Sequence, residues 1–393
     1  MTSSIRDLDI PSRILLGPGP SNVDPRVTRA MSAPVIGYLD PAWFAVMDET
    51  VALLRQVYGT ENRMTFPLSG TGTSGMEALF YNLVEPGDRV IVGLNGYFGD
   101  RMLQIAQRAG ADVIPVRAMW GEPIDPERVR IALKENPGVS LVAVVHGETS
   151  TGVLQPLDGL GRVVREYDAL LMADCVTTLG GEAVDVDARL IDAAYSCTQK
   201  ALGCPPGLSP ITVGERAWAK INARRTPAQS WYLDLKLLGD YWLGGRTYHH
   251  TPPASLIYGL REGLRIILEE GTEQRYARHQ RNAEALQAGL DRFGLPFIAA
   301  DGCRLPALTA VQLPDTLDDA KVRTLLRDRY NLEIGGGLGP LRGKAWRIGL
   351  MGFGSTATNV LLVLAALETA LAGEGYPVQP GQAVEAAARR LAA

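Results

Sequence analysis

The chain has 393 residues, with 39 Lys and Arg against 43 Asp and Glu, so its formal net charge is −4. Hydrophobic residues make up 46% and charged residues 21%, which argues against a disordered chain, and the mildly acidic balance gives no support to binding of nucleic acid or an anionic membrane. The best candidate for a membrane span, Val360–Leu367, ends after eight residues where about 18 are needed, and no signal peptide is visible, so we expect a cytoplasmic protein of two or three domains.

The predicted elements begin with an N-terminal arm at residues 1–20, where Gly17-Pro18-Gly19-Pro20 favours an extended chain. Residues 21–270 then alternate short apolar runs with segments of helical periodicity, such as Arg101–Ala109 and Pro126–Lys134. The candidate strands are Arg89–Leu94, Asp112–Val116, Ser140–His146, Ala169–Asp174, Asp192–Ser196 and Ser209–Val213. This alternation predicts a large α/β domain whose parallel sheet is covered by helices on both faces.

Residues 271–393 show a different pattern and are expected to form a smaller α+β domain. An amphipathic helix predicted at Ser255–Glu270, which Gly271 ends, connects it to the large domain. A short terminal helix is predicted within residues 378–393. The other elements expected here are a helix at 272–293, strands at Ala307–Gln312, Leu332–Ile334 and Ala345–Gly349, and helices at Leu317–Asp328 and Ala357–Leu371.

Metal binding is not expected. His249 and His250 are adjacent, and neighbouring residues on a strand point to opposite faces, so they cannot readily chelate one ion. The cysteines match no zinc-binding spacing, and we interpret most of them as free thiols packed in the interior. They are Cys175, Cys197, Cys204 and Cys303.

Ligands of a parallel sheet bind beyond the carboxyl ends of its strands, so polar side chains that follow strands are functional candidates. Asp174 ends the apolar run Ala169–Ala173, and Lys200 follows the next predicted strand, 26 residues later. Singly, Asp174 is typical of a helix cap or a turn, and Lys200 of an exposed surface. Together they indicate an aldehyde cofactor, since a lysine forms a Schiff base with it and a carboxylate keeps its pyridine nitrogen protonated.

The cofactor that fits this pair, pyridoxal phosphate, also needs an anion site and a flat contact for its ring. The glycine-rich turn Ser69–Gly75 precedes a helical pattern, where free backbone amides suit a phosphate. Phe98 follows one predicted strand and can stack on the ring, and Ser150 follows another and can bond near the ring hydroxyl. Taken alone, the turn also fits a non-catalytic nucleotide-binding or scaffold protein, and Phe98 fits a core position.

Arg347 lies in the otherwise apolar run Trp346–Gly352 of the smaller domain. A buried guanidinium without a partner is costly, so this side chain needs an anion. Two explanations stay open at this point, a bidentate contact with a substrate carboxylate and a salt bridge inside the protein.

Five motifs together resemble the class V branch of the fold-type I pyridoxal-phosphate aminotransferases, and within it the alanine/serine–glyoxylate aminotransferase group. They span about residues 13–375 and are Leu16–Asn22, His146–Pro156, Gln199–Leu202, Tyr248–Thr251 and Gly336–Pro340. The resemblance implies a mostly parallel, seven-stranded sheet in the large domain. It also implies a homodimer whose active sites are shared across the interface.

The resemblance assigns the cofactor contacts residue by residue. Lys200 matches the Schiff-base lysine, and Asp174 matches the partner of the pyridine nitrogen. Ser150 matches a contact on the hydroxyl side of the ring. The remaining matches are Thr71, Gly72 and Gln199 at the phosphate, Thr73 where some members carry His, Phe98 at the ring, and Tyr248 and Thr251 at the phosphate of the neighbouring subunit.

The resemblance also implies the substrate contacts. Arg347 matches the arginine that binds the substrate carboxylate, and Gly37, Tyr38 and Ser150 are expected to line the substrate site. The implied reaction is a ping-pong transamination that moves an amino group from a small L-amino acid, alanine or serine, to glyoxylate and gives glycine. Lys200 is expected to be the base that moves the α-proton.

Two alternatives remain within pyridoxal chemistry. Ureidoglycine–glyoxylate aminotransferases look similar around Ile36–Pro41 and Trp231–Leu235, but that branch carries Gln and Asn where this chain has Tyr38 and Tyr248, which disfavours a ureido substrate. A cysteine desulfurase shares the fold but needs a mobile, reactive cysteine near the substrate, for which Cys303 is the candidate.

Overall fold

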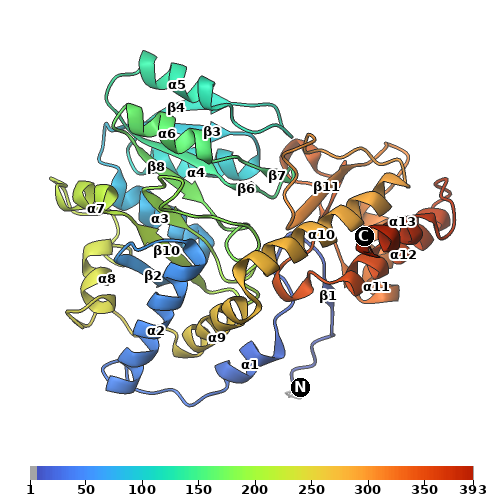
Figure 1. Cartoon of the computed structure of the whole chain (residues 1–393), viewed down its shortest axis with the longest axis horizontal. Helices are drawn as coiled ribbons and strands as arrows, with labels where there is room; N and C mark the ends of the chain where they lie inside the picture. Colours follow the sequence, from blue (N-terminus) through green and yellow to red (C-terminus); the bar gives the residue numbers. More distant parts are fainter. Residues whose placement is uncertain (1–6, 393) are drawn as a thin grey trace, which may run out of the picture.

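A computed structural model describes residues 7–392. Its largest feature is a seven-stranded sheet, in which β10 runs antiparallel to both of its neighbours and the other strands are parallel (Figure 1). The strands, in their order across the sheet, are β2 (Met64–Ser69), β10 (Leu208–Val213), β9 (Ala193–Tyr195), β8 (Leu170–Asp174), β5 (Val139–Val145), β3 (Arg89–Leu94) and β4 (Asp112–Arg117). The predicted α/β class with a mostly parallel sheet is confirmed.

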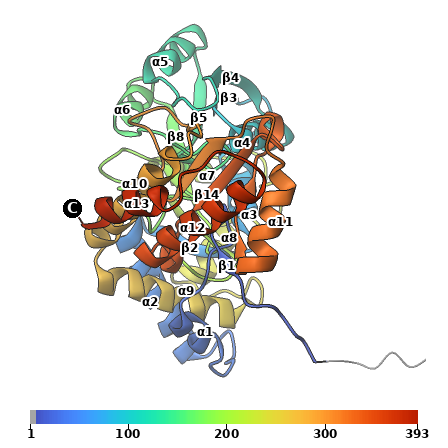
Figure 2. The ribbon, with the colours of Figure 1, turned by 90° about the vertical axis from the view of Figure 1, so that its right-hand side faces the viewer.

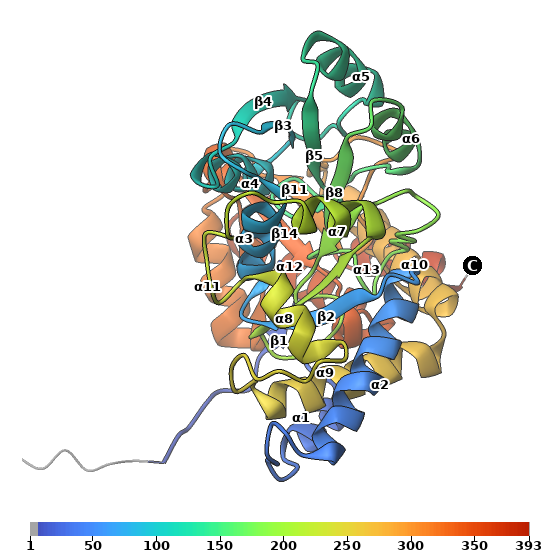
Figure 3. The same ribbon diagram turned by 90° about the vertical axis from the view of Figure 1, so that its left-hand side faces the viewer.

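Helices cover both sides of this sheet. Figure 3 shows α3 and α4 on one side and α5 and α6 on the other, as the alternation of strands and helices requires. The helices of this part are α1 (Pro25–Met31), α2 (Pro41–Tyr58), α3 (Gly72–Leu83), α4 (Tyr97–Arg108), α5 (Pro126–Glu135), α6 (Asp158–Glu166), α7 (Glu215–Asn222), α8 (Leu235–Trp242) and α9 (Ala254–Glu270). Within residues 7–392, no helix has the length and apolar character needed to cross a membrane.

One edge strand, β2, was not predicted from the sequence. Its segment contains Pro67, which has no backbone N–H to donate to a sheet and therefore weakens a strand pattern. The structure accommodates Pro67 because β2 lies at the edge and pairs with β10 alone. By contrast, β3 has the predicted bounds.

The C-terminal part is built on a three-stranded antiparallel sheet with helices packed beside one another (Figure 2). Its strands are β11 (Leu308–Gln312), β14 (Ala345–Gly349) and β13 (Gly335–Gly336), and its helices are α10 (Thr272–Asp291), α11 (Asp319–Tyr330), α12 (Ala357–Gly373) and α13 (Gln382–Ala392). The two largest clusters of buried apolar residues are one that runs from Trp43 to Ile267 and one that gathers mainly C-terminal residues from Ala285 to Ala387. The domain boundary at residue 270 stays a prediction that this separation supports.

The arm is extended, and part of it is packed rather than free. Residues Ile14–Leu15 form β1, which pairs in parallel with β12 (Leu332–Glu333), and Leu16 is fully buried. The segment predicted as a strand at Leu332–Ile334 therefore finds its partner in the arm. This contact leads the following residues, Gly17–Pro20, toward the carboxyl ends of the large sheet, where Gly19 and Pro20 line a cavity.

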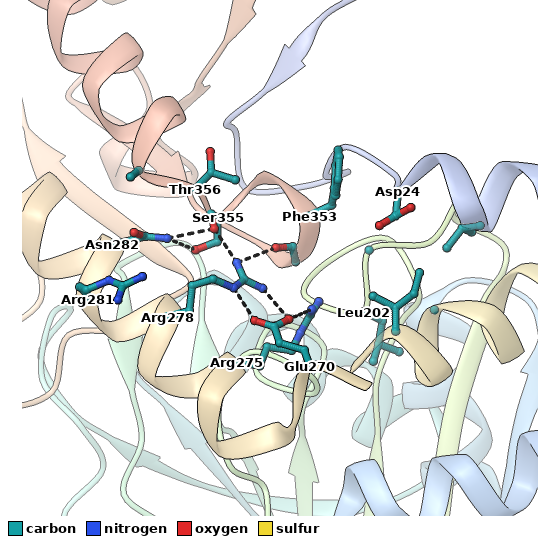
Figure 4. Close-up of a pocket in the computed structure, with 16 residues that line it drawn as sticks. Asp24, Leu202, Glu270, Arg275, Arg278, Arg281, Asn282, Phe353, Ser355 and Thr356 are labelled. Atoms are coloured by element: carbon teal, nitrogen blue, oxygen red, sulfur yellow. Dashed lines mark hydrogen bonds and ion pairs between the residues drawn. The ribbon is translucent and has the colours of Figure 1, made fainter. Parts of the chain in front are cut away.

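An ion-pair cluster joins α9 to α10 beside a cavity of about 390 Å³ between the two parts (Figure 4). Glu270 accepts from Arg275 Nη1 at 2.7 Å and from Arg278 Nε at 2.5 Å. Arg275 is only 4% exposed and also donates to the carbonyls of Gly180 and Ala201. The carboxylate of Glu270 thus compensates a buried guanidinium that holds the turn after Lys200.

We expect Glu270→Ala to lower the free energy of unfolding by about 2 kcal/mol, because it leaves the buried charge of Arg275 without its carboxylate. This figure is below the usual loss for a buried pair because Glu270 is partly exposed. Chemical denaturation measures the change. The neighbouring exposed residue provides a control, since Glu269→Ala breaks only solvent-screened ion pairs and should leave stability close to that of the wild type. Equal losses in both variants would contradict the assignment.

Candidate active site

A cavity of about 320 Å³ lies beyond the carboxyl ends of β5, β8 and β9. The structure brings to its wall the residues that the sequence predicted from separate strand ends. They are Thr71, Gly72, Thr73, Phe98, Asp174, Gln199 and Lys200. Because parallel strands end at one edge of the sheet, side chains far apart in the sequence converge there.

Asp174 is the last residue of β8 and is buried. Its Oδ2 accepts a hydrogen bond from the Tyr195 hydroxyl at 2.6 Å, and its Oδ1 accepts one from the backbone N–H of Val176 at 2.8 Å. Burial raises the pKa of Asp174, and these two hydrogen bonds and the nearby charge of Lys200 oppose that rise. The carboxylate is therefore held in one orientation at the wall of the cavity.

Lys200 reaches the cavity from the turn after β9, and its side chain lies against the N-terminal arm. Its Nζ donates to the carbonyl of Pro18. A Cβ on Gly19 would lie 2.7 Å from Lys200 Cδ and Cε, and the φ of +114° at Gly19 also favours glycine. Among the described residues no carboxylate forms an ion pair with Lys200. Burial lowers the pKa of this amine, so more of it is neutral and nucleophilic than for an exposed lysine.

The first turn of α3 forms an anion cradle at the cavity. Thr71 caps the helix but its side chain makes no capping bond, which leaves the first backbone amides free. A Cβ on Gly72 would approach Cys197 Cβ to 2.9 Å, so only glycine brings the backbone this close. Gln199 Oε1 is buried without a hydrogen-bond partner in the part of the chain described here. The free backbone N–H groups fit an anion such as a phosphate, whereas the unpaired Gln199 Oε1 is an acceptor and fits a group that donates a hydrogen bond.

Phe98 occupies the second position of α4, and sequence analysis missed the cation beside it. The guanidinium carbon of Arg101 lies 4.8 Å from the centre of the Phe98 ring, and Arg101 Nη1 lies 3.4 Å from Thr73 Oγ1. Arg101 and Tyr195 both line the cavity and neither was predicted. Their signals were the helical i, i+3 spacing from Phe98 to Arg101 and a tyrosine directly before Ser196 at the end of a buried strand.

The other predicted contacts lie outside this cavity. Ser150 is buried, and its hydroxyl donates to Glu148 Oε1 at 2.6 Å. The Tyr38 and Tyr248 rings are 4.6 Å apart near the surface, and Tyr248 is 51% exposed. Gly37 and Thr251 are exposed too, and Thr251 Oγ1 is 3.4 Å from the Tyr248 hydroxyl. Their roles at a cofactor, a substrate or a partner subunit stay predictions.

Arg347 lies on β14 and is 7% exposed. Its Nε donates to the carbonyl of Gly336 at 2.7 Å, and its Nη1 to the carbonyl of Thr149, a cavity residue, at 3.4 Å. Within residues 7–392 it forms no ion pair, so the internal salt bridge left open by the sequence is absent there. Burial lowers the pKa of Arg347 to about 10, and the charge of Glu148 opposes this. The guanidinium stays a cation at neutral pH and lacks an anion.

Comparison with known proteins identifies the family of this chain. The model of the class-V aminotransferases matches residues 39–340. This chain belongs to the class-V aminotransferase family. Alanine–glyoxylate aminotransferase of Callithrix jacchus is 41% identical to this aminotransferase over 93% of the chain and 89% of the relative.

Two solved structures resemble the aminotransferase closely. Ureidoglycine–glyoxylate aminotransferase of Bacillus subtilis superposes with a TM-score of 0.96 at 43% identity, covering 99% of this chain and all of the other. Alanine–glyoxylate aminotransferase of a Nostoc species superposes with a TM-score of 0.92 at 49% identity, covering 94% and 98%. The predicted family and fold type are thereby confirmed.

The cofactor of this family, pyridoxal phosphate, fits the residues present. Lys200 would supply the amine for its aldehyde, Asp174 would supply an anion for its ring nitrogen, and the α3 cradle would hold its phosphate. When bound, it supplies an aldehyde that condenses with amines and a ring that accepts an electron pair. No group of three or more potential metal ligands exists within residues 7–392.

Proposed function

We propose that this aminotransferase moves the amino group of a small L-amino acid, alanine or serine, to glyoxylate and releases glycine. One observation carries the proposal: Arg347 is a buried cation that has no carboxylate partner within residues 7–392, and it bonds to a residue of the cavity that holds Lys200 and Asp174. Such a cation fits the carboxylate that amino acids and glyoxylate share. The relatives named for ureidoglycine and those named for alanine both have glyoxylate in their names.

The proposed roles follow from the contacts. Arg347 binds the substrate carboxylate and turns the α-carbon toward Lys200. The amine of Lys200 is partly neutral because it is buried. Its Nζ takes the proton from the substrate α-carbon, holds it and then gives it up again. Asp174, locked by Tyr195 and Val176, keeps a proton on the ring nitrogen. The arm residues Pro18 and Gly19 cover Lys200 and limit the access of water.

A ureidoglycine donor is the second candidate, favoured by the close superposition on the Bacillus enzyme. The family resemblance, and not the cavity lining, places Tyr38 and Tyr248 where the ureidoglycine branch has amides. Their paired rings offer no amide for a ureido group, which favours alanine or serine as the donor. A cysteine desulfurase is disfavoured. Cys303 is buried, bonds to the Ala300 carbonyl at 3.2 Å and does not line the cavity, and burial raises its pKa.

The visible absorption spectrum of the purified protein tests the proposal. We expect a yellow protein that bleaches when L-alanine or L-serine is added and recovers its colour with glyoxylate. L-Cysteine and ureidoglycine are the matched comparisons. Bleaching by ureidoglycine alone would assign the second candidate. A colourless protein that stays so after incubation with pyridoxal phosphate would overturn the proposal.

Arg347→Lys is expected to raise the KM for the amino donor about 100-fold and to change kcat less. A lysine keeps the charge but loses the two-pronged donor geometry, and a hydrogen bond to a charged group contributes about 1.5–3 kcal/mol. Steady-state kinetics with alanine and glyoxylate measure both constants. Arg342→Lys is the control, since Arg342 is exposed in the turn before β14. An unchanged KM for Arg347→Lys would remove Arg347 from the substrate site.

We also propose a homodimer. An exposed aromatic and aliphatic patch supports it, because patches of this kind mark interaction sites. Its members are Leu39, Trp231, Tyr232 and Tyr248; Trp231 and Tyr232 lie against His249, next to Tyr248, and Tyr248 lies against Tyr38, next to Leu39. The patch adjoins Thr251, which the family resemblance places at the neighbouring subunit's phosphate. Light scattering after size exclusion should give about twice the 42.3 kDa of one chain. A monomer that retains full activity would exclude shared sites.

A further inference from the structure

Glu148, in the short strand β6 (Gly147–Glu148), is fully buried and forms no ion pair with any residue from 7 to 392. Its carboxylate instead accepts four hydrogen bonds. Oε1 accepts from the N–H of Ser150 at 2.9 Å and from its hydroxyl at 2.6 Å. Oε2 accepts from the N–H groups of Phe98 at 3.0 Å and Gly99 at 3.3 Å.

These contacts define the charge state of Glu148. All three backbone partners are donors, and the Ser150 hydroxyl accepts from the N–H of Tyr97 at 2.9 Å, which directs its own proton to Glu148. A protonated carboxyl group needs an acceptor for its O–H, and all the partners of this carboxyl group are donors, so it is deprotonated. Burial raises the pKa of Glu148, and the four hydrogen bonds oppose this rise. The N-terminal end of the α4 dipole also stabilises the anion.

The same segment touches both halves of the proposed site. Through Phe98 and Gly99 the carboxylate holds the first turn of α4, which carries the ring-stacking aromatic residue. The next residue, Thr149, gives its carbonyl to Arg347. A Cβ on Gly96 would lie 2.4 Å from Glu148 Cγ and Cδ, so the close approach of α4 to this carboxylate depends on glycine.

We propose that Glu148 is a positioning residue of the active site, with Ser150 as its hydrogen-bonding partner. It fixes the Phe98 ring against the cofactor and, through Thr149, fixes Arg347 relative to that ring. Ser150 acts through Glu148 in this scheme, since its hydroxyl proton is already given to the carboxylate. The proposal rests on the proposed function, because it assigns the residues that align its cofactor and substrate.

Glu148→Gln tests this proposal. The amide nitrogen of the glutamine must face either the two Ser150 donors or the N–H groups of Phe98 and Gly99, and it cannot accept a hydrogen bond from them. Circular dichroism of the bound cofactor band reports the orientation of its ring, and we expect this signal per bound cofactor to change by more than half. We further expect a KM for the amino donor raised about 30-fold and a Kd for pyridoxal phosphate raised about tenfold. Glu148→Asp, which keeps the charge, should recover part of each loss.

A merely structural role for Glu148 predicts a different result. It would lower the Tm and the active fraction but leave the dichroism per bound cofactor and the KM of the folded enzyme unchanged, and that outcome overturns the proposal. If Glu148→Gln does not fold, Ser150→Ala removes one donor without a change in charge. It must then shift the dichroism in the same direction with about a tenfold rise in KM, and wild-type values would overturn the proposal.

Two controls separate this inference from the function on which it rests. Glu127→Gln changes an exposed glutamate on α5 and should match the wild type. The wild-type protein is titrated first with pyridoxal phosphate and then with alanine and glyoxylate. Failure there contradicts the proposed function, whereas a functional wild type with unaltered Glu148→Gln and Ser150→Ala contradicts only the positioning role.

Discussion

Lys200→Ala is expected to lower kcat for transamination by at least about 10⁴-fold, because Lys200 is proposed to supply both the nucleophilic amine and the proton-transfer base. The fold should persist, since the variant removes an amine whose burial is unfavourable and whose only described bond is to the Pro18 carbonyl. Pyridoxal phosphate should still bind through the α3 cradle and Asp174. Single-turnover absorbance with alanine measures the loss, and the spectrum reports whether cofactor is bound.

The control for this variant is Lys321→Ala, which changes an exposed lysine on α11 and should behave as the wild type. A further test exploits the space that Lys200→Ala vacates beside Gly19. A small primary amine added at high concentration can enter it and should restore part of the proton transfer. Turnover above 1% of the wild-type rate without added amine would show that another group is the base.

Asp174→Asn is expected to lower kcat about 10³-fold. Asparagine has nearly the same shape and still accepts from the Val176 N–H, but it lacks the negative charge that keeps a proton on the ring nitrogen. Removing one member of a buried, hydrogen-bonded charge pair costs about 2–5 kcal/mol, and each 1.36 kcal/mol is tenfold in rate. Steady-state kinetics give the rate. The absorption maximum of the bound cofactor should shift as its ring loses the proton.

Tyr195→Phe is the matched control for Asp174. It removes only the hydroxyl that donates to Oδ2 at 2.6 Å and leaves the carboxylate in place. We expect a tenfold loss of kcat or less, since a hydrogen bond to a charged group contributes about 1.5–3 kcal/mol and water can replace part of it. A larger effect for Tyr195→Phe than for Asp174→Asn would mean that orientation, and not charge, is what Asp174 contributes.

The residues proposed to act on the cofactor and the residue proposed to bind the substrate come from different parts of the fold. Asp174 ends β8 and Lys200 follows β9, and both are proposed to act on the cofactor, whereas Arg347 lies on β14 of the small sheet and is proposed to bind the substrate. The segment after β5 that carries Glu148 and Thr149 touches both sets. Arrangements built from two parts of a fold allow the substrate site to vary while the cofactor site stays constant, which fits relatives whose names give different amino donors.

The sequence by itself determined the α/β class, the central strands to within one residue at each end, and the polar side chains that follow them. These features are local, because strand periodicity lies in consecutive residues, and Asp174 ends one apolar run while Lys200 comes a few residues after the next. The edge strand β2, which contains Pro67, was not predicted. The family resemblance added the assignments that single residues cannot carry.

Only the tertiary structure decided which residues surround these groups. Pro18 meets Lys200 across 182 positions, and Thr149 meets Arg347 across 198. Such contacts depend on how the arm and the small sheet pack, and the hydrophobic periodicity of the sequence does not predict them. Likewise, a glutamate in a polar run has no sequence signal for full burial. Glu148 became a buried anion because glycine at position 96 lets the first turn of α4 approach it and donate its free amides.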